Sequence, residues 1–401
     1  MTTLEQLAQP ETEAEEERRT SFLELFFDLV FVFAVTQVTA LVADDPTAHG
    51  FAHGALVFGL VWWAWSGYAW LTNAIDIESA VARVLVLVAA GASFFLAIAL
   101  PDAFGDDGLR FALAYLVVRL VHIGLYVWGL RSDPEHQAAI LRLAPWFFVA
   151  PFVALGGGFA DGNTRVALWI LSLAIDVAGA ASVGRGGFRV SPSHFAERYA
   201  LFVIIALGES VVAVGATATG LPRDATFFAV VATAFALAAV LWWSYFDFPA
   251  LAAARALRRA PAERRGALAR DLFTFFHFPN VLGIIYIAVA AKKAVAHPSE
   301  PLSGGGRAAL GIGLALFLLQ FVLGRLRVIH RVSWERLAGI AVLAVVVVVG
   351  RDLEAVWLLA LALAVLVATT VAEDLRLGTA RRIVRADGPP VPRDTPVPWK
   401  G

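Results

Sequence analysis

The chain has 401 residues, of which 59% are hydrophobic and only 16% are charged, and its mean hydropathy is +0.72. A soluble globular domain is about 45–50% apolar and about 25% charged, so the composition excludes that class and indicates a polytopic membrane protein. The net charge of −1 provides no general basic field for nucleic acid. The absence of cysteine excludes disulfides, thiolate metal sites and cysteine nucleophiles.

The two ends of the chain differ from its apolar body. Residues 1–20 are rich in glutamate and contain Arg18 and Arg19, without the positive start or cleavage site of a signal peptide. Residues 377–401 include the proline-rich stretch GPPVPRDTPVPWKG. We expect an acidic disordered tail at one end and a proline-rich disordered tail at the other, both in the cytoplasm.

Apolar runs of about 18 residues or more predict transmembrane helices, and the chain reads as an all-α bundle of such helices. Twelve spans are predicted, at residues 22–43, 51–73, 79–100, 108–130, 139–157, 163–183, 197–219, 223–246, 271–293, 308–328, 335–350 and 353–373. Only Arg351 and Asp352 separate the last two, which predicts a tight hairpin.

The positive charges predict how the bundle is oriented. With the N-terminus inside, 24 of the 32 Lys and Arg residues fall in cytoplasmic segments and 7 in outer ones, while Arg119 lies inside a span. This bias predicts that both termini are cytoplasmic. The longest cytoplasmic connection, residues 248–270, is rich in Ala and Arg. It is either a linker of the positive-inside type or a segment attracted to anionic lipid headgroups.

Parts of the sequence are repeated in order. SFLELFFDLVFVFAV in the first span matches HFAERYALFVIIALG in the seventh, so that Glu24 corresponds to Glu197. WWAWSGY in the second span matches WWSYFDF in the eighth, and Ala-Arg precedes both the third and the ninth. We expect two six-span halves, residues 21–183 and 184–376, related by a two-fold axis along the membrane normal.

Two carboxylates mark the first span. Glu24 and Asp28 are four residues apart and therefore share one face of a helix. Glu24 lies near the expected membrane boundary, whereas Asp28 lies about 9 Å deeper than Ser21 at about 1.5 Å per residue. A charge at this depth is usually paired or lines a cavity. Asp28 is thus either a functional or paired residue, or part of a solvated helix end.

Arg119 lies near the middle of the fourth span and shares a polar stripe with His122. Arginine keeps its charge, so it needs an acid or a wet cavity inside a membrane. Asp28, Asp176 and Glu209 are acids at plausible depth, and we expect the partner to come from the first or seventh span. The stripe either holds a structural salt bridge or lines a pathway.

The seventh span carries three more candidates for the polar core: Glu197, Arg198 and Glu209. Glu209 is either a proton carrier or a hydrogen-bonding core residue. Asp28 and Glu209 are the deepest acids of the helices that begin the two halves. We therefore expect them to line one polar cavity, with Arg119 or His277 as donor.

The ninth span contains FFHFPNVLGI, which places His277 and Asn280 on either side of Pro279. A proline inside a helix removes a hydrogen bond and kinks the chain, and such breaks occur at substrate sites of transporters. His277 is either a packing residue or part of such a site. Zinc-protease, nucleophile-elbow and phosphate-loop motifs are missing, and the histidines have no metal spacing, so we expect no catalytic residue, metal or cofactor.

Several motifs resemble the bacterial low temperature requirement A family: ELFFDLVFVFA from Glu24, ALPDAFG from Ala99, FALAY followed by Arg119, and Glu197-Arg-Tyr followed by LGES. This resemblance implies a polytopic protein of the bacterial inner membrane. A fainter resemblance links FFD and VFVFA in the first span to the lysosomal potassium and proton channels, whose first helix carries Phe-Ser-Asp. It implies a hydrophobic constriction near Phe33.

We read the chain first as a transporter or channel for a small ion or solute, with its pathway between the two halves. A membrane enzyme acting on a lipid or small metabolite is the second reading, and a cavity clustering His122, Glu209 and His277 would favour it. A sensor or scaffold is the third, favoured by closed salt bridges without a cavity. The lipid bilayer is the expected partner, and nucleic acid is not.

Overall fold

The computed structural model describes residues 20–131, 133–182 and 190–386, and most of the two predicted tails lies outside these ranges. In the described ranges the chain is helical apart from turns and one isolated bridge. A long helix covers each of the twelve predicted runs. These helices are α2 (Phe22–Asp44), α3 (Ala48–Ala74), α4 (Ala80–Ala99), α5 (Gly108–Gly129), α6 (Pro134–Gly158), α7 (Gly162–Ser182), α8 (Pro192–Ala218), α9 (Ala225–Phe246), α12 (Phe276–Ala296), α13 (Gly304–Ile329), α14 (Trp334–Val349) and α15 (Ala355–Ala386).

The end of α15 corrects one predicted boundary. The proline-rich tail was expected to begin at residue 377, but the helix continues to Ala386. Its last part carries Arg381, which forms an ion pair with Asp247 at the end of α9 and so ties this stretch to the bundle.

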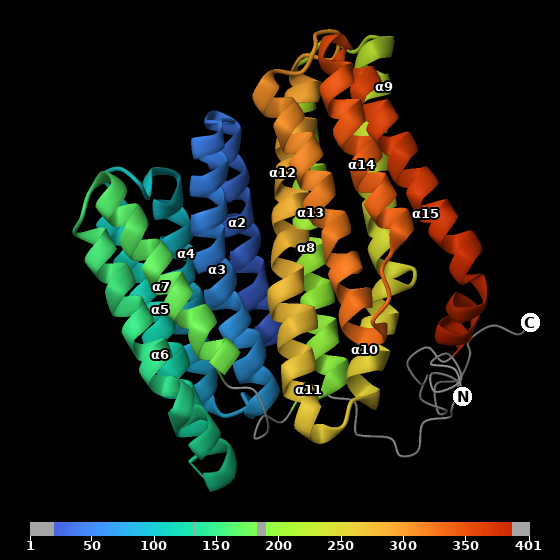
Figure 1. Ribbon diagram of the computed structural model, residues 1–401. Helices are drawn as coiled ribbons and strands as arrows, with labels where there is room; N and C mark the ends of the chain where they lie inside the picture. Colours follow the sequence, from blue (N-terminus) through green and yellow to red (C-terminus); the bar gives the residue numbers. More distant parts are fainter. Residues whose placement is uncertain (1–19, 132, 183–189, 387–401) are drawn as a thin grey trace, which may run out of the picture.

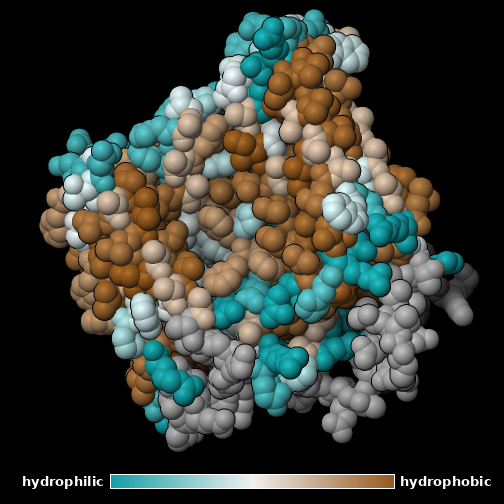
Figure 2. Space-filling model, in the orientation of Figure 1, coloured by the Kyte–Doolittle hydropathy of each residue, from teal (hydrophilic) through white to brown (hydrophobic). Residues whose placement is uncertain are grey.

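Ten helical stretches in the described ranges are long and apolar enough to cross a membrane. The other two long helices are α14, which has only 16 residues, and α3, whose tryptophans and glycines lower its hydropathy. Many large apolar side chains are exposed around the bundle, and Figure 2 shows them as a broad brown region between teal ends. A surface this apolar requires lipid, so the chain is a multi-pass membrane protein.

Side-chain caps fix where several helices begin. Ser21 and Glu24 form a capping box, in which each side chain bonds the backbone N–H of the other residue. Thr47 and Ser79 accept backbone N–H groups at the starts of α3 and α4, and Asp224 does the same for α9. These caps satisfy backbone donors that would otherwise be costly at a membrane boundary.

Helix α12 is the centre of the bundle. It packs against α2 and α3 on one side, and against α8, α9, α13 and α15 on the others. Helices α4 to α7 form a group beyond α2 and α3, while α14 and α15 lie at the opposite edge (Figure 1). Two glycines bring α12 and α13 close: a Cβ at Gly283 would lie 2.5 Å from the carbonyl oxygen of Gly313. Small residues of this kind let membrane helices approach backbone to backbone.

The connection between α9 and α12 is helical, as its Ala- and Arg-rich sequence predicts. It consists of α10 (Pro249–Arg259), α11 (Ala262–Ala269) and a π-helical turn, Arg270–Phe275, that leads directly into α12. We call the end of the bundle that carries α10 and α11 the basic end, because these two helices contain Arg255, Arg258, Arg259, Arg264 and Arg265. It is the lower end in Figure 1.

The π-helical turn lies just before Pro279, where a break in the helix was predicted. Two of its carbonyl groups accept side-chain donors: Leu272 O lies 2.9 Å from His277 Nδ1, and Thr274 O accepts from Trp62 Nε1 at 2.9 Å. Such π turns are often found at functional sites. Here the turn binds the indole of Trp62 on α3 through Thr274 and the imidazole of His277 on α12 through Leu272.

Candidate functional site

Four ionisable side chains meet where α2 crosses α8. Glu24 Oε1 lies 3.0 Å from His194 Nε2 and 3.1 Å from Arg198 Nη1, and Arg198 Nη2 lies 2.7 Å from Asp28 Oδ1. All four residues are at most 2% exposed. We call this group the α2/α8 ion cluster.

The sequence brings these groups together through one spacing used twice. Glu24 and Asp28 are four residues apart on α2, and His194 and Arg198 are four residues apart on α8, so each pair occupies one helix face. The predicted shared face of the two acids and the pairing of Asp28 are therefore confirmed. His194 was missed, although its spacing from Arg198 in HFAER was a readable signal.

Neighbouring helices hold the cluster in place. Trp65 Nε1 on α3 donates to Asp28 Oδ1 at 2.8 Å. The side chain of Asn73 lies 3.1 Å from His194 Nδ1 and also bonds the backbone of Ser191. Asp28 Oδ2 is buried and receives no hydrogen bond from any described residue. The cluster therefore keeps one acceptor position open.

Arg119 pairs with a carboxylate from another helix, as predicted, but that helix is α7 and not the first or seventh span. Its two terminal nitrogens lie 2.6 and 2.7 Å from the two oxygens of Asp176, and Tyr115 adds a contact to Nη1 at 2.9 Å. Both members of the pair are almost fully buried. The bidentate geometry fits a planar guanidinium and makes the interaction strong and directional.

A small cavity of about 90 Å³ lies beside this pair, near the basic end. Arg119, His122 and Tyr126 line it from α5, and Ser66 from α3 faces them, while α11 borders it on another side. His122 Nε2 lies 3.0 Å from the carbonyl oxygen of Gly67, and its other ring nitrogen is buried without a described partner. The predicted polar stripe of α5 therefore borders an internal space.

A larger cavity of about 400 Å³ lies in the second half, also at the basic end. His277 lines it together with Tyr245, whose hydroxyl lies 2.7 Å from His277 Nε2, and Gln320, whose amide nitrogen lies 3.2 Å from Nδ1. Asn280 is separate from this group: it is fully buried, and its amide lies 3.5 Å from the carbonyl oxygen of Phe317.

Glu209 does not share a site with Asp28, which corrects the expectation of one common cavity. It accepts a short hydrogen bond of 2.5 Å from Thr36, eight residues beyond Asp28 on α2. This separation is about 12 Å along the helix. Neither acid lines either of the two cavities. The donors are Arg198 for Asp28 and Thr36 for Glu209, not Arg119 or His277.

Two further candidates lie outside the buried clusters. Glu197 is exposed and accepts from the backbone N–H of Thr20, so it does not belong to the polar core despite its match to Glu24. Phe33 is half-buried, and its ring packs 5.5 Å from that of Phe94 on α4, within the first half. A constriction at Phe33 remains a prediction.

The comparisons with known proteins agree with this architecture. The family described as bacterial low temperature requirement A protein (LtrA) matches residues 19–371. An uncharacterized protein of Rhizobium meliloti (strain 1021) is 33% identical over 298 residues, which cover 71% of this chain and 72% of that protein. Residues 19–371 include the α2/α8 ion cluster, the smaller cavity and the Arg119–Asp176 pair, whereas Glu373, Arg376, Leu377 and Val384 of the larger cavity lie beyond them. The chain therefore belongs to the bacterial low temperature requirement A family.

Proposed function

We propose that the protein is an inner-membrane transporter for a small ion or solute, with a pathway between its first six and last six long helices. The α2/α8 ion cluster carries this proposal, because it puts four buried ionisable groups where the first helices of the two halves meet. Ionisable groups inside a membrane are costly and typically mark ion or substrate pathways.

The packing order of the helices supports two repeated halves, and six helices in each half favour a parallel orientation. In the first half, α2 packs on α4, α4 on α5, and α6 on α7. The corresponding contacts of the second half are α8 with α12, α12 with α13, and α14 with α15. The last helix of each half also holds a buried acid bound to an arginine: Asp176 with Arg119, and Glu373 with Arg336. Together with the positive charges, this order favours twelve spans with both termini in the cytoplasm.

The positions of the cavities support access from one side. Both cavities lie at the basic end, which the positive-inside rule assigns to the cytoplasm. The α2/α8 ion cluster would then act as the closed gate of this conformation. Opening it would require Arg198 to leave Glu24 and Asp28.

Flux into proteoliposomes across a panel of ions and small solutes tests the proposal. With a transported species identified, Asp28→Asn and Glu209→Gln should each abolish flux while the protein remains folded. Glu197→Gln is the matched control, because its carboxylate is exposed on the same helix as Arg198. Wild-type flux in both neutral variants would leave these acids as structural residues. If no ion or solute in the panel is transported, the proposal that the protein is a transporter is rejected.

A sensor or scaffold is the second candidate, because the α2/α8 ion cluster is closed by its own ion pairs and lines neither cavity. The enzyme reading loses support within the described residues. His122 lines the smaller cavity, His277 the larger one and Glu209 neither, so the clustering that would have favoured chemistry is not found.

A further inference from the structure

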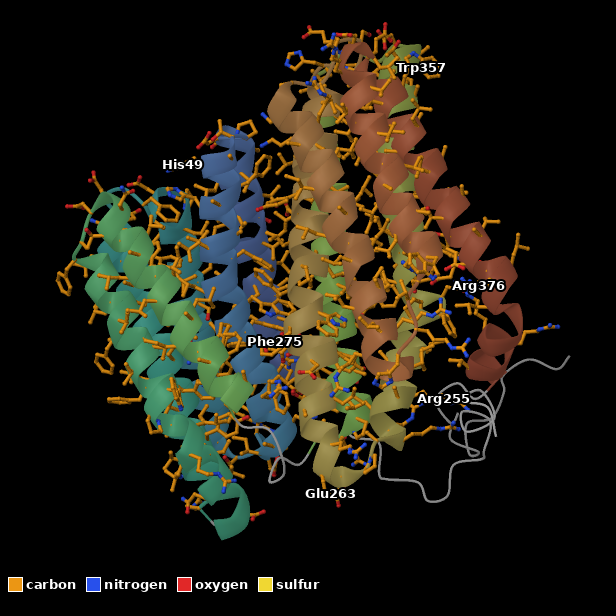
Figure 3. The ribbon with its side chains drawn as sticks, viewed as in Figure 1. His49, Arg255, Glu263, Phe275, Trp357 and Arg376 are labelled. Atoms are coloured by element: carbon orange, nitrogen blue, oxygen red, sulfur yellow. The ribbon has the colours of Figure 1, made fainter. Side chains whose placement is uncertain are left out.

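Four arginines line the larger cavity, and the proposed transport pathway gives them no role. Arg255 from α10, Arg325 from α13, Arg331 from the loop that follows α13 and Arg376 from α15 all line it. Figure 3 shows Arg255 and Arg376 reaching toward this region from two different helices. One carboxylate, that of Glu373, also lines the cavity.

The described acids near Arg325, Arg331 and Arg376 do not balance these three arginines. Glu373 is already paired with Arg336, which does not line the cavity: Arg336 Nη2 lies 2.6 Å from the Glu373 carboxylate. Glu335 serves two arginines at once, since it forms an ion pair with Arg376 and lies 3.9 Å from Arg325. Counted over the described residues, Arg325, Arg331 and Arg376 therefore give the mouth of the cavity more positive than negative charge.

The inner surface has the opposite character. Phe321 is buried, and Val328, Ile329, Leu377 and Val384 add apolar surface around it. Gln320 lies at the buried end, where its side-chain oxygen has no hydrogen-bond partner among the described residues. A volume of about 400 Å³ lies within the range of small-molecule sites, which is about 300–1,000 Å³.

We propose that this cavity binds an anionic amphiphile, with a phosphate or carboxylate head on Arg331 and Arg376 and an apolar chain along Phe321 and Leu377. Guanidinium groups bind such oxyanions in a bidentate manner, and basic pockets at the cytoplasmic side of membrane helices hold acidic lipid headgroups. The positive-inside rule assigns the basic end, and with it this cavity, to the side of the inner leaflet. The site shares no lining residue with the α2/α8 ion cluster.

The test measures lipid retention by the full chain in detergent micelles, using native mass spectrometry with equal amounts of phosphatidylglycerol and phosphatidylcholine. An arginine near an anionic surface contributes about a fivefold gain in affinity. The double variant Arg331→Gln/Arg376→Gln should therefore bind phosphatidylglycerol about 25-fold more weakly. Arg327→Gln is the matched control, because Arg327 lies two residues from Arg325 on α13, pairs with Asp271 and does not line the cavity.

A second variant tests the apolar part. A Cβ at Gly324, which lines the cavity, would meet only Leu272, at an ordinary 3.9 Å. Gly324→Leu should therefore fill the space and reduce lipid retention, while the better helix propensity of leucine leaves the fold intact. Unchanged retention in this variant would overturn the assignment of the chain to this cavity.

Isothermal titration with dodecyl phosphate and with inorganic phosphate separates the sources of the ligand. If dodecyl phosphate displaces the bound lipid, the result supports the site and shows that soluble amphiphiles also enter it. Retention of the lipid against dodecyl phosphate supports the site as one for a bilayer lipid. Equal retention of the two lipids by the wild-type protein, or equal effects of the double variant and Arg327→Gln, would overturn the proposal. The proposal would also be overturned if inorganic phosphate bound as tightly as dodecyl phosphate.

Discussion

Replacing Arg198 by methionine should destabilise the protein strongly. The guanidinium contacts Glu24 at 3.1 Å and Asp28 at 2.7 Å. Without it, Glu24 keeps His194 at 3.0 Å, but Asp28 keeps only the indole N–H of Trp65. The variant thus leaves one buried carboxylate with a single donor. Removing one partner of a buried ion pair costs about 3–5 kcal/mol, and we expect Arg198→Met to fall in this range.

The double variant Arg198→Met/Asp28→Leu removes the uncompensated charge together with its partner. Apolar replacement of a whole buried pair is often neutral or stabilising, so the double variant should regain most of the lost stability. The assay is equilibrium unfolding in mixed micelles of the wild type, both single variants and the double variant, which yields their coupling free energy.

A surface pair provides the control for this cycle. Arg110→Met removes a cation that is 76% exposed and pairs with Asp107, and exposed pairs contribute about 0–1 kcal/mol. If Arg198→Met costs no more than Arg110→Met, the α2/α8 ion cluster is not a desolvated network and the reasoning fails. A double variant as unstable as the sum of the single ones would refute the coupling.

Three further substitutions have defined outcomes in the same unfolding assay. Arg119→Lys should cost about 1.5–3 kcal/mol, because lysine cannot reproduce the two bonds to Asp176; full stability would show that charge alone suffices. Trp65→Phe should lose about 1.5–3 kcal/mol with its hydrogen bond to the charged carboxylate on α2, and a loss below about 0.5 kcal/mol would contradict that bond. Gly313→Leu should cost more than about 2 kcal/mol, because its Cβ would lie 2.8 Å from the carbonyl oxygen of Gly283; a fully stable variant would refute close packing of α12 and α13.

The helices could be predicted because each long apolar run fixes its own structure. Polar caps such as Ser21 with Glu24 also mark boundaries in the sequence. The end of α15 was placed too early, since its last turns are charged and are held by the tertiary ion pair of Arg381 with Asp247. Sequence hydropathy does not contain that information.

The sites were predicted less completely than the helices. A four-residue spacing correctly placed Glu24 and Asp28 on one face, because that relation is local to one helix. The partner of Arg119 depends on how α5 and α7 are rotated against each other, which no local pattern specifies. The match of Glu197 to Glu24 misled for the same reason: equivalent positions in a repeat can face different neighbours.

The π-helical turn at Arg270–Phe275 has a consequence for how α12 tolerates changes in length. Such a turn contains one residue more than an α-helical path needs. Deleting a single residue there would restore α-helical hydrogen bonding and leave the two flanking parts of the helix in nearly the same rotation, but it would close the carbonyl groups that the turn leaves open. Trp62 and His277 would then lose their carbonyl acceptors together. A one-residue deletion in this turn should therefore be far more harmful than the same deletion in the loop between α12 and α13.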